Sequence, residues 1–386
     1  MSAKKAYDAA VIGAGVFGAW TALQLRRAGL SVALCDAYGP ANSRASSGGE
    51  SRLIRMGYGA DENFTRWSWR SLGMWKELFA WTGKALFCQT GILWIFGDDA
   101  AANYATATRD TLTRVGIPHE TMERAELEKR WPQIDFGEAR WGLFEQQSGV
   151  LLARRAVAAV VEAAIEDGVE YSQEAVEAPR GSGRVGSVQT RLGREIPAGQ
   201  FIFCCGPWMG KVFPELLGNR IFVTRQEVFF FGVPAGDRRF APPAMPGWLY
   251  LADLFYGMPD LESRGIKIAH DKHGPPCDPD SQERVPSPEA IATAREYLAK
   301  RFPALANAPL VEARVCQYEN SSNGDFLVDK HPNFENVWLV GGGSGHGFKH
   351  GPAMGEHVAA VVTGSAKREP RFSLETKREV QKRIVF

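Results

Sequence analysis

The glycine-rich segment 13–18 has the composition and spacing of a cradle for a dinucleotide pyrophosphate. It reads GAGVFG and lies between an apolar run at 8–12 and a helical pattern at 19–28. In such a cradle the first glycine permits a tight turn, the second lets the backbone approach the phosphates, and the third lets the helix pack on the strand. The helix N-terminus adds unpaired N–H groups and a partial positive charge. The residues expected to hold the cofactor here are Gly13, Gly15, Val16, Phe17 and Gly18.

An acidic residue stands where this cradle needs a partner for a ribose. Asp36 follows a second apolar run at 31–35, 23 residues after Gly13. Its carboxylate would accept hydrogen bonds from ribose hydroxyls, and no arginine follows at once to bind a 2′-phosphate. The motif fits NAD as well as FAD, so by itself it leaves the cofactor open.

A second glycine-rich junction lies near the C-terminus, at 340–349 (VGGGSGHGFK), between a predicted strand at 336–340 and a predicted helix at 353–363. A helix N-terminus aimed at a ligand stabilises negative charge, which for a flavin develops around N1 and the C2 carbonyl on reduction. The alternative, on this segment alone, is a flexible loop in which Lys349 is a solvated surface residue.

Three kinds of single residue could do chemistry if the fold brings them to a cavity. Cys316 lies on an alternating segment at 310–318, where a core thiol is the commoner outcome, but a thiolate there could attack an electron-poor carbon of a cofactor. Lys267 lies mid-strand between isoleucines, so its side chain faces either solvent or a cavity. Arg52 and Arg55, three apart after a loop, could share one helical face and bind a carboxylate bidentately.

The elements that must position these residues follow from hydrophobic periodicity and from glycine and proline boundaries. The predicted helices are 19–28, 62–80, 100–115, 123–130, 151–164, 288–301 and 353–363. The predicted strands are 8–12, 31–35, 90–96, 200–205, 221–231, 248–256, 265–269, 310–318 and 336–340, with a hairpin at 180–194. Both ends read as α/β and the middle mixes strands and helices, which is typical of a nucleotide-binding domain interrupted by insertions.

Composition bounds the class of protein. The 386 residues are 45% hydrophobic and 23% charged, which is enough for a sizeable core. Lys and Arg number 45 and Asp and Glu 44, so a nucleic-acid partner is not expected. No apolar run approaches the roughly 20 residues of a membrane helix, and no signal peptide is recognisable, so a cytoplasmic location without membrane contact is predicted. Six cysteines without a CxxC pair argue against a disulfide scaffold and against a metal site.

Taken together, these motifs resemble the monomeric sarcosine oxidase family of flavoproteins, which includes N-methyltryptophan and pipecolate oxidases, within the wider D-amino-acid-oxidase-like superfamily. The resemblance covers nearly the whole chain. It is carried by GAGVFGAW, SRLIRMGYG, YGMP, GIKIAH, CQY followed by DFLVD, and GSGHGFKHGP. Many flavoproteins share the first motif, and the combination of 316–318, 325–329 and 345–349 is far more specific.

The resemblance implies FAD, bound covalently through the flavin 8α-methyl to Cys316. It implies oxygen activation by Lys267, binding of the substrate carboxylate by Arg55 and Lys349, and a second arginine, Arg52, close to the flavin. Tyr58, Tyr256 and Tyr318 match aromatic residues that line the family's site, and His270 is the candidate for its active-site histidine. The cofactor loop near the C-terminus is matched by Gly343, Gly345, His346, Gly347, Phe348 and Lys349.

The resemblance also predicts the architecture. We expect an α/β fold, α+β overall, with a Rossmann-like FAD-binding domain and an interleaved substrate domain built on an antiparallel or mixed sheet. The FAD-binding domain is assigned to 1–85, 152–218 and 319–386, and the substrate domain to 86–151 and 219–318. The family is often monomeric, so a monomer is expected.

The chain departs from the family pattern in three places. Asp36 replaces the more usual glutamate at the ribose, and residues 47–48 stand where sarcosine oxidases carry a histidine near the flavin. Asp260, Glu262 and Arg264 make the loop before Lys267 unusually charged. The substrate therefore stays open among sarcosine-like, N-methyl, cyclic and iminodiacetate-like amino acids; for the last, His270, His273 or His350 are candidates to bind the second carboxylate.

The predicted reaction is oxidation of a C–N bond of a secondary or N-substituted amino acid to an imine, with molecular oxygen reduced to hydrogen peroxide. The main alternative is a flavin-dependent amino-acid dehydrogenase that passes electrons to another acceptor. Two further alternatives are an NAD-dependent dehydrogenase and a nucleotide-binding protein without redox turnover.

Overall fold

The computed structural model describes residues 6–97 and 102–381, and its backbone is organised around two large sheets. The first sheet has strand order β17-β18-β11-β1-β2-β9, and β10 pairs with β11. Its inner strands, from β18 to β9, are parallel, and β17 is antiparallel to β18. The strands are β1 Tyr7–Ile12, β2 Val32–Cys35, β9 Glu170–Ser172, β10 Ser187–Gln189, β11 Glu195–Phe203, β17 Leu327–Lys330 and β18 Val337–Gly341.

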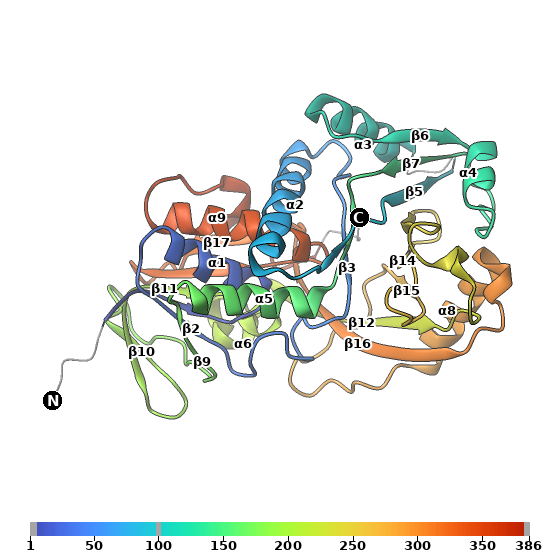
Figure 1. The fold of residues 1–386 in the computed structure, drawn as a ribbon. Coiled ribbons are helices and arrows are strands. Elements are labelled where there is room, and N and C mark those ends of the chain that lie inside the picture. The colour runs from blue at the N-terminus through green and yellow to red at the C-terminus, as the bar shows by residue number, and fades with distance from the viewer. Residues whose placement is uncertain (1–5, 98–101, 382–386) are drawn as a thin grey trace.

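Helices cover one face of this sheet, and the side-chain alternation of β1 explains why. Ala9 and Val11 pack with residues of α1, α5 and α9, whereas Ala10 and Ile12 belong to a second cluster on the opposite face. Figure 1 shows α1, α5 and α9 gathered beside this sheet, with α2 next to them. The helices are α1 Val16–Arg27, α2 Glu62–Thr82, α5 Ala153–Glu166 and α9 Gly351–Val362.

The second sheet has the order β16-β12-β15-β14-β13-β5-β7-β6, antiparallel except for the parallel pair β13 and β5. Its strands are β5 Ile92–Phe96, β6 Glu120–Glu123, β7 Trp141–Glu145, β12 Ile221–Phe231, β13 Gly247–Tyr250, β14 Phe255–Met258, β15 Ile266–His270 and β16 Leu310–Ser321. Helix α8, Pro288–Arg301, packs on one face of it, against Phe229, Ile266 and Ile268 among others. Figure 1 shows this sheet and α8 on the side of the molecule away from α1 and α9.

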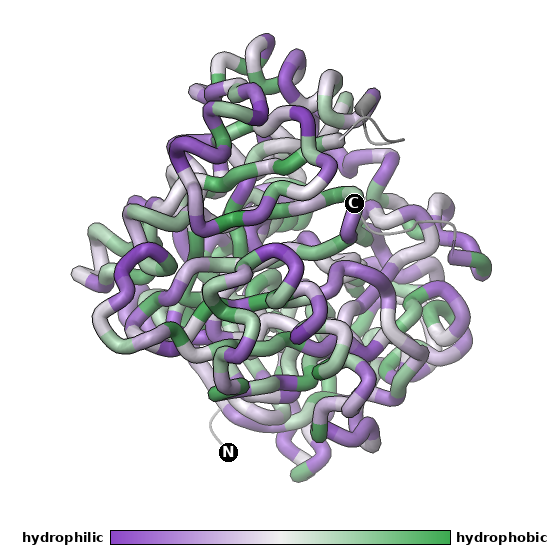
Figure 2. Tube along the Cα trace, turned by 90° about the vertical axis from the view of Figure 1, so that its right-hand side faces the viewer, coloured by the Kyte–Doolittle hydropathy of each residue, from purple (hydrophilic) through white to green (hydrophobic). Residues whose placement is uncertain are grey.

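A small antiparallel sheet, β3-β8-β4, joins Arg52–Ile54, Gly149–Leu151 and Phe87–Cys88. The remaining helices include α3 Ala102–Val115, α4 Arg124–Arg130, α6 Met209–Val212 and α7 Pro214–Leu217. No helix among the described residues is long and apolar enough to cross a membrane, and Figure 2 shows hydrophobic and hydrophilic residues interleaved along the trace.

The mixed α/β class is confirmed, and most predicted elements lie within a few residues of the observed ones. The strands of the first sheet come from 7–35, 170–203 and 327–341, and those of the second from 92–145 and 221–321. The division into two domains stays a prediction, which this partition supports. The long strand β16 runs past the boundary proposed at 318.

Three predicted elements differ from the structure. The strand predicted at 248–256 is a hairpin of β13 and β14, because the chain reverses at 251–254, where Leu254 has a φ of 55°. Arg52 lies on strand β3, so Arg52 and Arg55 do not share a helical face as predicted. The hairpin predicted at 180–194 is displaced, because β10 pairs with β11. The first two residues of the helix predicted at 100–115 lie outside the described residues.

Candidate functional site

The turn after β1 has the geometry that its glycines predict. Gly13 has a φ of +106°, and a Cβ added there would lie 2.3 Å from the carbonyl oxygen of Cys204. A Cβ on Gly18 would lie 1.8 Å from the oxygen of Gly13, so α1 packs against the turn only because both residues lack side chains. Gly15 caps the N-terminus of α1, and a Cβ added there would meet only Ser47 Oγ, at 3.4 Å, which is an ordinary contact. The predicted cradle is therefore formed.

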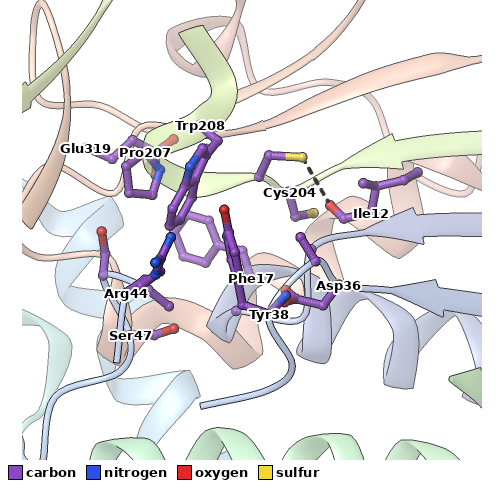
Figure 3. Close-up of a pocket in the computed structure, with 18 of the residues that line it drawn as sticks. Ile12, Phe17, Asp36, Tyr38, Arg44, Ser47, Cys204, Pro207, Trp208 and Glu319 are labelled. Carbon is purple, nitrogen blue, oxygen red and sulfur yellow. Dashed lines mark hydrogen bonds between the residues drawn. The ribbon is translucent and has the colours of Figure 1, made fainter. Parts of the chain in front are cut away.

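A large cavity of about 670 Å³ opens at the carboxyl ends of the parallel strands. Figure 3 shows Phe17, Asp36, Trp208 and Glu319 around it. Most of the predicted cofactor residues line it, namely Gly13, Gly15, Val16, Phe17, Asp36, Arg52, Gly343, Gly345, Gly347 and Phe348. The two glycine-rich segments from opposite ends of the chain thus face one space. Gly18, Cys316, His346 and Lys349 are not among the residues that line it.

Asp36 is held by the backbone on both of its carboxylate oxygens. Oδ2 accepts a hydrogen bond from the amide of Ala14 at 2.7 Å, and Oδ1 accepts from the amides of Tyr38 and Gly39. Burial raises the pKa of this carboxyl, and the three backbone donors oppose that effect. The carboxylate is thus fixed at the edge of the large cavity, and its binding to a ribose stays a prediction.

Arg52, which lines the large cavity, contacts Cys316. Arg52 Nη2 lies 3.4 Å from Cys316 Sγ and also donates to the carbonyl oxygen of Ser46 at 2.9 Å. Nη1 of the same guanidinium donates to the carbonyl oxygen of Ser51. Three contacts therefore fix the Arg52 guanidinium beside the sulfur, at the wall of the cavity.

Lys267 is buried, with 1% of its surface exposed. It lies on β15 between Ile266 and Ile268, which pack toward α8, so its side chain points to the opposite face. Nζ donates to the carbonyl oxygen of Ser51 at 2.9 Å. Burial, followed by the charge of Arg52, lowers the pKa of Lys267 well below its usual value. The sequence leaves open whether this side chain faces solvent or a cavity, and its burial excludes solvent.

Arg55 and Lys349 converge on Tyr58. Lys349 Nζ donates to the Tyr58 hydroxyl at 2.7 Å and lies 5.1 Å from the ring centroid. The guanidinium of Arg55 lies 4.7 Å from the Tyr58 ring and 4.7 Å from the ring of Trp94. Both cations are buried, so Lys349 is not the solvated surface residue that the loop alone allowed. Two buried positive groups on one aromatic residue form a site that favours an anion.

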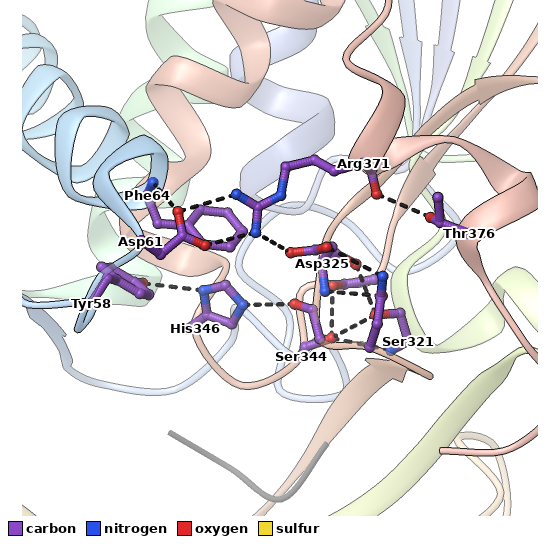
Figure 4. A network of polar contacts seen from close by, with 12 residues as sticks. Tyr58, Asp61, Phe64, Ser321, Asp325, Ser344, His346, Arg371 and Thr376 are labelled. Carbon is purple, nitrogen blue, oxygen red and sulfur yellow. Dashed lines mark hydrogen bonds and ion pairs between the residues drawn. The ribbon is translucent and has the colours of Figure 1, made fainter. Parts of the chain in front are cut away.

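A polar network holds Tyr58 from behind. Its hydroxyl lies 2.7 Å from His350 Nε2 and 3.1 Å from His346 Nδ1, and His346 Nε2 lies 2.9 Å from the carbonyl oxygen of Gly324. Figure 4 shows Tyr58 and His346 beside an ion-pair cluster centred on Arg371. Arg371 Nη2 contacts Asp61 at 2.7 Å and Asp325 at 2.6 Å, which ties the start of α2 to the loop before β17.

The carboxylate of Glu145 holds the segment between Arg55 and Tyr58. It is 1% exposed and accepts hydrogen bonds from the amides of Met56 and Gly57 and from Trp94 Nε1, at 2.7 to 2.9 Å. Arg55 donates in turn to the carbonyl oxygen of Gly57. Sequence patterns do not reveal this role, because Glu145 ends a strand far away in the chain.

A second, small cavity of about 20 Å³ lies next to Arg55. We call it the Arg55–Asp271 cavity; it is lined by Arg55, Trp94, Tyr104, Leu249, Tyr250, Leu251, Leu254, Phe255, Tyr256 and Asp271. Burial raises the pKa of Tyr256 to about 12. A space of this size holds about one water molecule, so any larger ligand must displace part of the wall. The turn at 251–254 contributes Leu251 and Leu254 to that wall and lies outside the strands.

Tyr318 connects the two cavities. It lines the large cavity, and a Cβ on Gly345 would lie 2.8 Å from its ring. Its hydroxyl donates to Asp271 Oδ1 at 3.1 Å, on the side of the small cavity. A group bound beside Asp271 would therefore be one side chain away from a group in the large cavity.

His270 is placed differently from the other predicted site residues. Its ring stacks on Phe255 at 4.6 Å with an interplanar angle of 6°, and burial lowers its pKa. It is not among the residues that line the large cavity or the Arg55–Asp271 cavity. Asp271, the next residue, does line the Arg55–Asp271 cavity. Side chains alternate along a strand, so Asp271 points the same way as Lys267, away from the isoleucines. This alternation could have identified Asp271 as a site residue.

Glu319 is the other site residue that sequence patterns did not single out. It is 6% exposed and lines the large cavity, and its Oε1 accepts a hydrogen bond from the amide of Gly342 at 2.9 Å. Burial raises its pKa to about 7. It follows Tyr318 on β16, where alternation assigns it to the face opposite Cys316 and Tyr318, so the strand pattern gives no signal for it.

Comparisons with known proteins cover nearly the whole chain. The family described as FAD dependent oxidoreductase (DAO) matches residues 8–361. Monomeric sarcosine oxidase from Arthrobacter sp. is 29% identical over 377 residues, which are 96% of each chain. N-methyl-L-tryptophan oxidase from Salmonella arizonae is 30% identical over 390 residues, 95% of this chain and 97% of the relative.

Solved structures share the fold at lower identity. L-proline dehydrogenase from P. horikoshii superposes with a TM-score of 0.83 at 20% identity, covering 96% of this chain and 97% of the other. Fructosamine oxidase (Amadoriase II) from Aspergillus fumigatus has a TM-score of 0.81 at 22% identity, covering 97% and 90%. At these identities the likeness defines the architecture.

Proposed function

Because the chain belongs to the FAD-dependent oxidoreductase family, we propose that it is an FAD-dependent oxidase of secondary or N-substituted amino acids. The relatives named sarcosine oxidase and N-methyl-L-tryptophan oxidase support this class of substrate. Reduction of oxygen to hydrogen peroxide, action as a monomer and a cytoplasmic location belong to the same proposal and rest on the resemblance to that group.

The large cavity fits FAD. Its glycine turn, the N-terminus of α1 and Asp36 suit the adenosine and pyrophosphate, and it extends to Arg52 and Tyr318, where a ring would lie. Cys316 Sγ beside Arg52 would be the point of covalent attachment. When bound, FAD supplies the two-electron redox chemistry, from a C–N bond that becomes an imine to oxygen that becomes hydrogen peroxide.

The residues around Tyr58 would bind and orient the substrate. Arg55 and Lys349 would hold its carboxylate, and Tyr58 keeps both cations in place through its ring and its hydroxyl. Holding the carboxylate at two points sets the position of the carbon next to nitrogen, which contributes several kcal/mol to the barrier reduction. The same two cations lower the pKa of the bound amine, and the neutral amine is the form with a lone pair available for oxidation.

Lys267 would serve the reaction with oxygen. A buried ammonium group stabilises a developing oxygen anion far more than an exposed one, because little water screens it. Its contact with the Ser51 carbonyl places it one residue from Arg52, which lines the large cavity. This cation is the feature that favours an oxidase over a dehydrogenase with another electron acceptor.

The observation that carries the proposal is the convergence of two buried cations, Arg55 and Lys349, on Tyr58 beside a cavity suited to FAD. The test is anaerobic addition of sarcosine, N-methyl-L-tryptophan, L-proline and L-pipecolate to the holoenzyme, followed by air. Bleaching of the flavin by at least one of them, and fast reoxidation with one equivalent of peroxide, is expected. Slow reoxidation by air but fast reoxidation by a quinone would favour the dehydrogenase, and no bleaching by any N-substituted amino acid would overturn the proposal.

A further inference from the structure

We propose that Asp271 binds the amino group of the substrate and excludes substrates with a second carboxylate, so that the enzyme acts on monocarboxylic N-substituted amino acids. This inference deepens the proposed function and rests on it for the identity of the reaction. It removes the iminodiacetate-like class from the substrates that the sequence leaves open.

The wall of this cavity carries one basic and one acidic side chain. Arg55 is its cation and Asp271 its carboxylate, and its other lining residues are tyrosine, tryptophan, phenylalanine and leucine. An amino acid is itself a carboxylate and an ammonium group on one small apolar frame. A cavity with one positive and one negative group between apolar walls is therefore complementary to that zwitterion.

Two of the contacts that Asp271 makes hold it in place. Its amide donates to the carbonyl oxygen of Leu254 at 2.7 Å, which continues the pairing of β14 and β15 by one residue. Its Oδ1 accepts the hydroxyl proton of Tyr318 at 3.1 Å. A carboxylate fixed at backbone and side chain is preorganised to accept a further hydrogen bond, because little freedom is lost when a ligand binds.

The position of Asp271 also suits the reacting end of the substrate. Tyr318, its donor, lines the large cavity in which we place FAD. A substrate with its carboxylate at Arg55 and its nitrogen at Asp271 would present that nitrogen on the side of Tyr318. The C–N bond to be oxidised would then lie on the cofactor side, and the substituents would face the aromatic and leucine wall.

A second carboxylate has no complementary partner in this cavity. Next to Asp271 it would meet a like charge in a space with little water, which costs several kcal/mol in comparable sites. The histidines considered for this role do not line the cavity. His270 stacks on Phe255, His350 is fully buried against Tyr58, and His273 Nδ1 lies 3.0 Å from Gln381 Nε2. Arg55 is the one cation among the described residues that line it.

The test uses the holoenzyme and two inert ligands that differ by one carboxylate. Methoxyacetate has the shape of sarcosine and oxydiacetate that of iminodiacetate, with oxygen in place of nitrogen. Their dissociation constants are measured from the change in flavin absorbance in the wild type, in Asp271→Asn and in Asp278→Asn. Asp278 is an exposed carboxylate that pairs with Lys211 and lines none of the cavities described, so Asp278→Asn controls for the loss of one negative charge.

We expect the wild type and Asp278→Asn to bind methoxyacetate at least tenfold more tightly than oxydiacetate, and Asp271→Asn to reduce that ratio at least tenfold. The sarcosine concentration that gives half-maximal anaerobic flavin reduction should rise at least tenfold in Asp271→Asn, because the bound amino group loses its anionic partner. A ratio within twofold of the wild type in Asp271→Asn would overturn the inference.

Two measurements, the ratio of the dissociation constants of the inert ligands and the reduction of the flavin by amines, distinguish failure of this inference from failure of the proposed function. If no amine bleaches the flavin, the proposed function fails, yet the ratio of the two inert ligands still decides whether Asp271 repels a second carboxylate. If Asp271→Asn does not retain flavin, Asp271→Ser provides the same comparison with a smaller side chain. An unchanged ratio in that variant would equally overturn the inference.

Discussion

Arg52 Nη2 lies 3.4 Å from Cys316 Sγ, although 264 positions separate the two residues in the chain. The guanidinium is held by the carbonyl oxygens of Ser46 and Ser51, so its position does not depend on the sulfur. A fixed cation beside a thiol stabilises the negative charge that the sulfur carries when it acts as a nucleophile. The pair therefore offers a chemical reason for attachment of a flavin at Cys316.

Replacement of Cys316 tests this attachment directly. Wild-type protein precipitated with acid should retain yellow flavin in the pellet, and Cys316→Ala should release all of it into the supernatant, because no covalent bond remains. Cys277→Ala, at a half-buried cysteine without a contact to Arg52, should behave as the wild type. A colourless pellet from the wild type would show that Cys316 carries no flavin.

Replacement of Lys267 should separate the two halves of the reaction. In Lys267→Met, reoxidation of the reduced flavin by oxygen should slow by about 100- to 1000-fold, the usual cost of one preorganised electrostatic group. Anaerobic reduction by substrate should change by less than about threefold, because the substrate carboxylate is expected at Arg55 and Lys349. Stopped-flow absorbance measures both steps, and Lys300→Met, at an exposed lysine of α8, is the control.

The oxygen reaction should also depend on pH through the same residue. Burial and Arg52 lower the pKa of Lys267, so its ammonium loses the proton at a lower pH than an exposed lysine does. In the wild type the reoxidation rate should therefore fall as pH rises through this pKa. In Lys267→Met the rate should be slow and flat. A wild-type rate that rises with pH would contradict a role for the ammonium.

Replacing either cation that would bind the substrate carboxylate, Arg55 or Lys349, should mainly weaken substrate binding. Arg55→Lys keeps the charge but loses the planar fork that stacks between Tyr58 and Trp94, so KM should rise by about 10- to 100-fold. Lys349→Met should have an effect of similar size. Steady-state peroxide assays give both values, and Arg70→Lys, on the exposed face of α2, should leave KM unchanged. Equal KM values in Arg55→Lys and the wild type would place the substrate carboxylate elsewhere.

Glu319 should make the stability of the flavin-free protein depend on pH. Its pKa is raised by burial from 4.5 to about 7, so the folded state holds a proton that the unfolded state has released. The stabilisation is complete below pH 4.5 and is lost as pH rises to about 7, a change of about 3 kcal/mol in the free energy of unfolding.

Urea unfolding at pH 4.5, 6 and 7.5 measures this change. Relative to Glu319→Gln, the wild type should lose stability steadily over that range, whereas the difference between the wild type and Glu375→Gln, at an exposed glutamate, should be constant. All three are made in the Cys316→Ala background, from which the unattached flavin is removed by unfolding in urea and gel filtration before the measurement. If the free energies of unfolding of the wild type and Glu319→Gln changed equally with pH over this range, Glu319 would be ionised to the same extent in the folded and the unfolded state.

The strand β15 shows how far local patterns reach. Alternation with Ile266 and Ile268 predicts that Lys267 faces away from them, and the structure places it there. Whether that face met solvent or a cavity could not be predicted, because the answer depends on β3 and the Ser51 carbonyl. The resemblance led to His270, which shares the face of the isoleucines, whereas Asp271 has the face of Lys267 and lines the cavity.

The sequence by itself determined the strand–turn–helix cradle around Gly13, the second glycine-rich loop and, through its motifs, the family. These features depend on hydrophobic periodicity and on the backbone freedom of glycine, which involve residues close in the chain. The tertiary structure alone decided that Lys349 meets Tyr58 across 291 positions, and that Asp271 stands beside Arg55. Charge and burial at a site come from segments packed together from the whole chain, and no local pattern records which of them will meet.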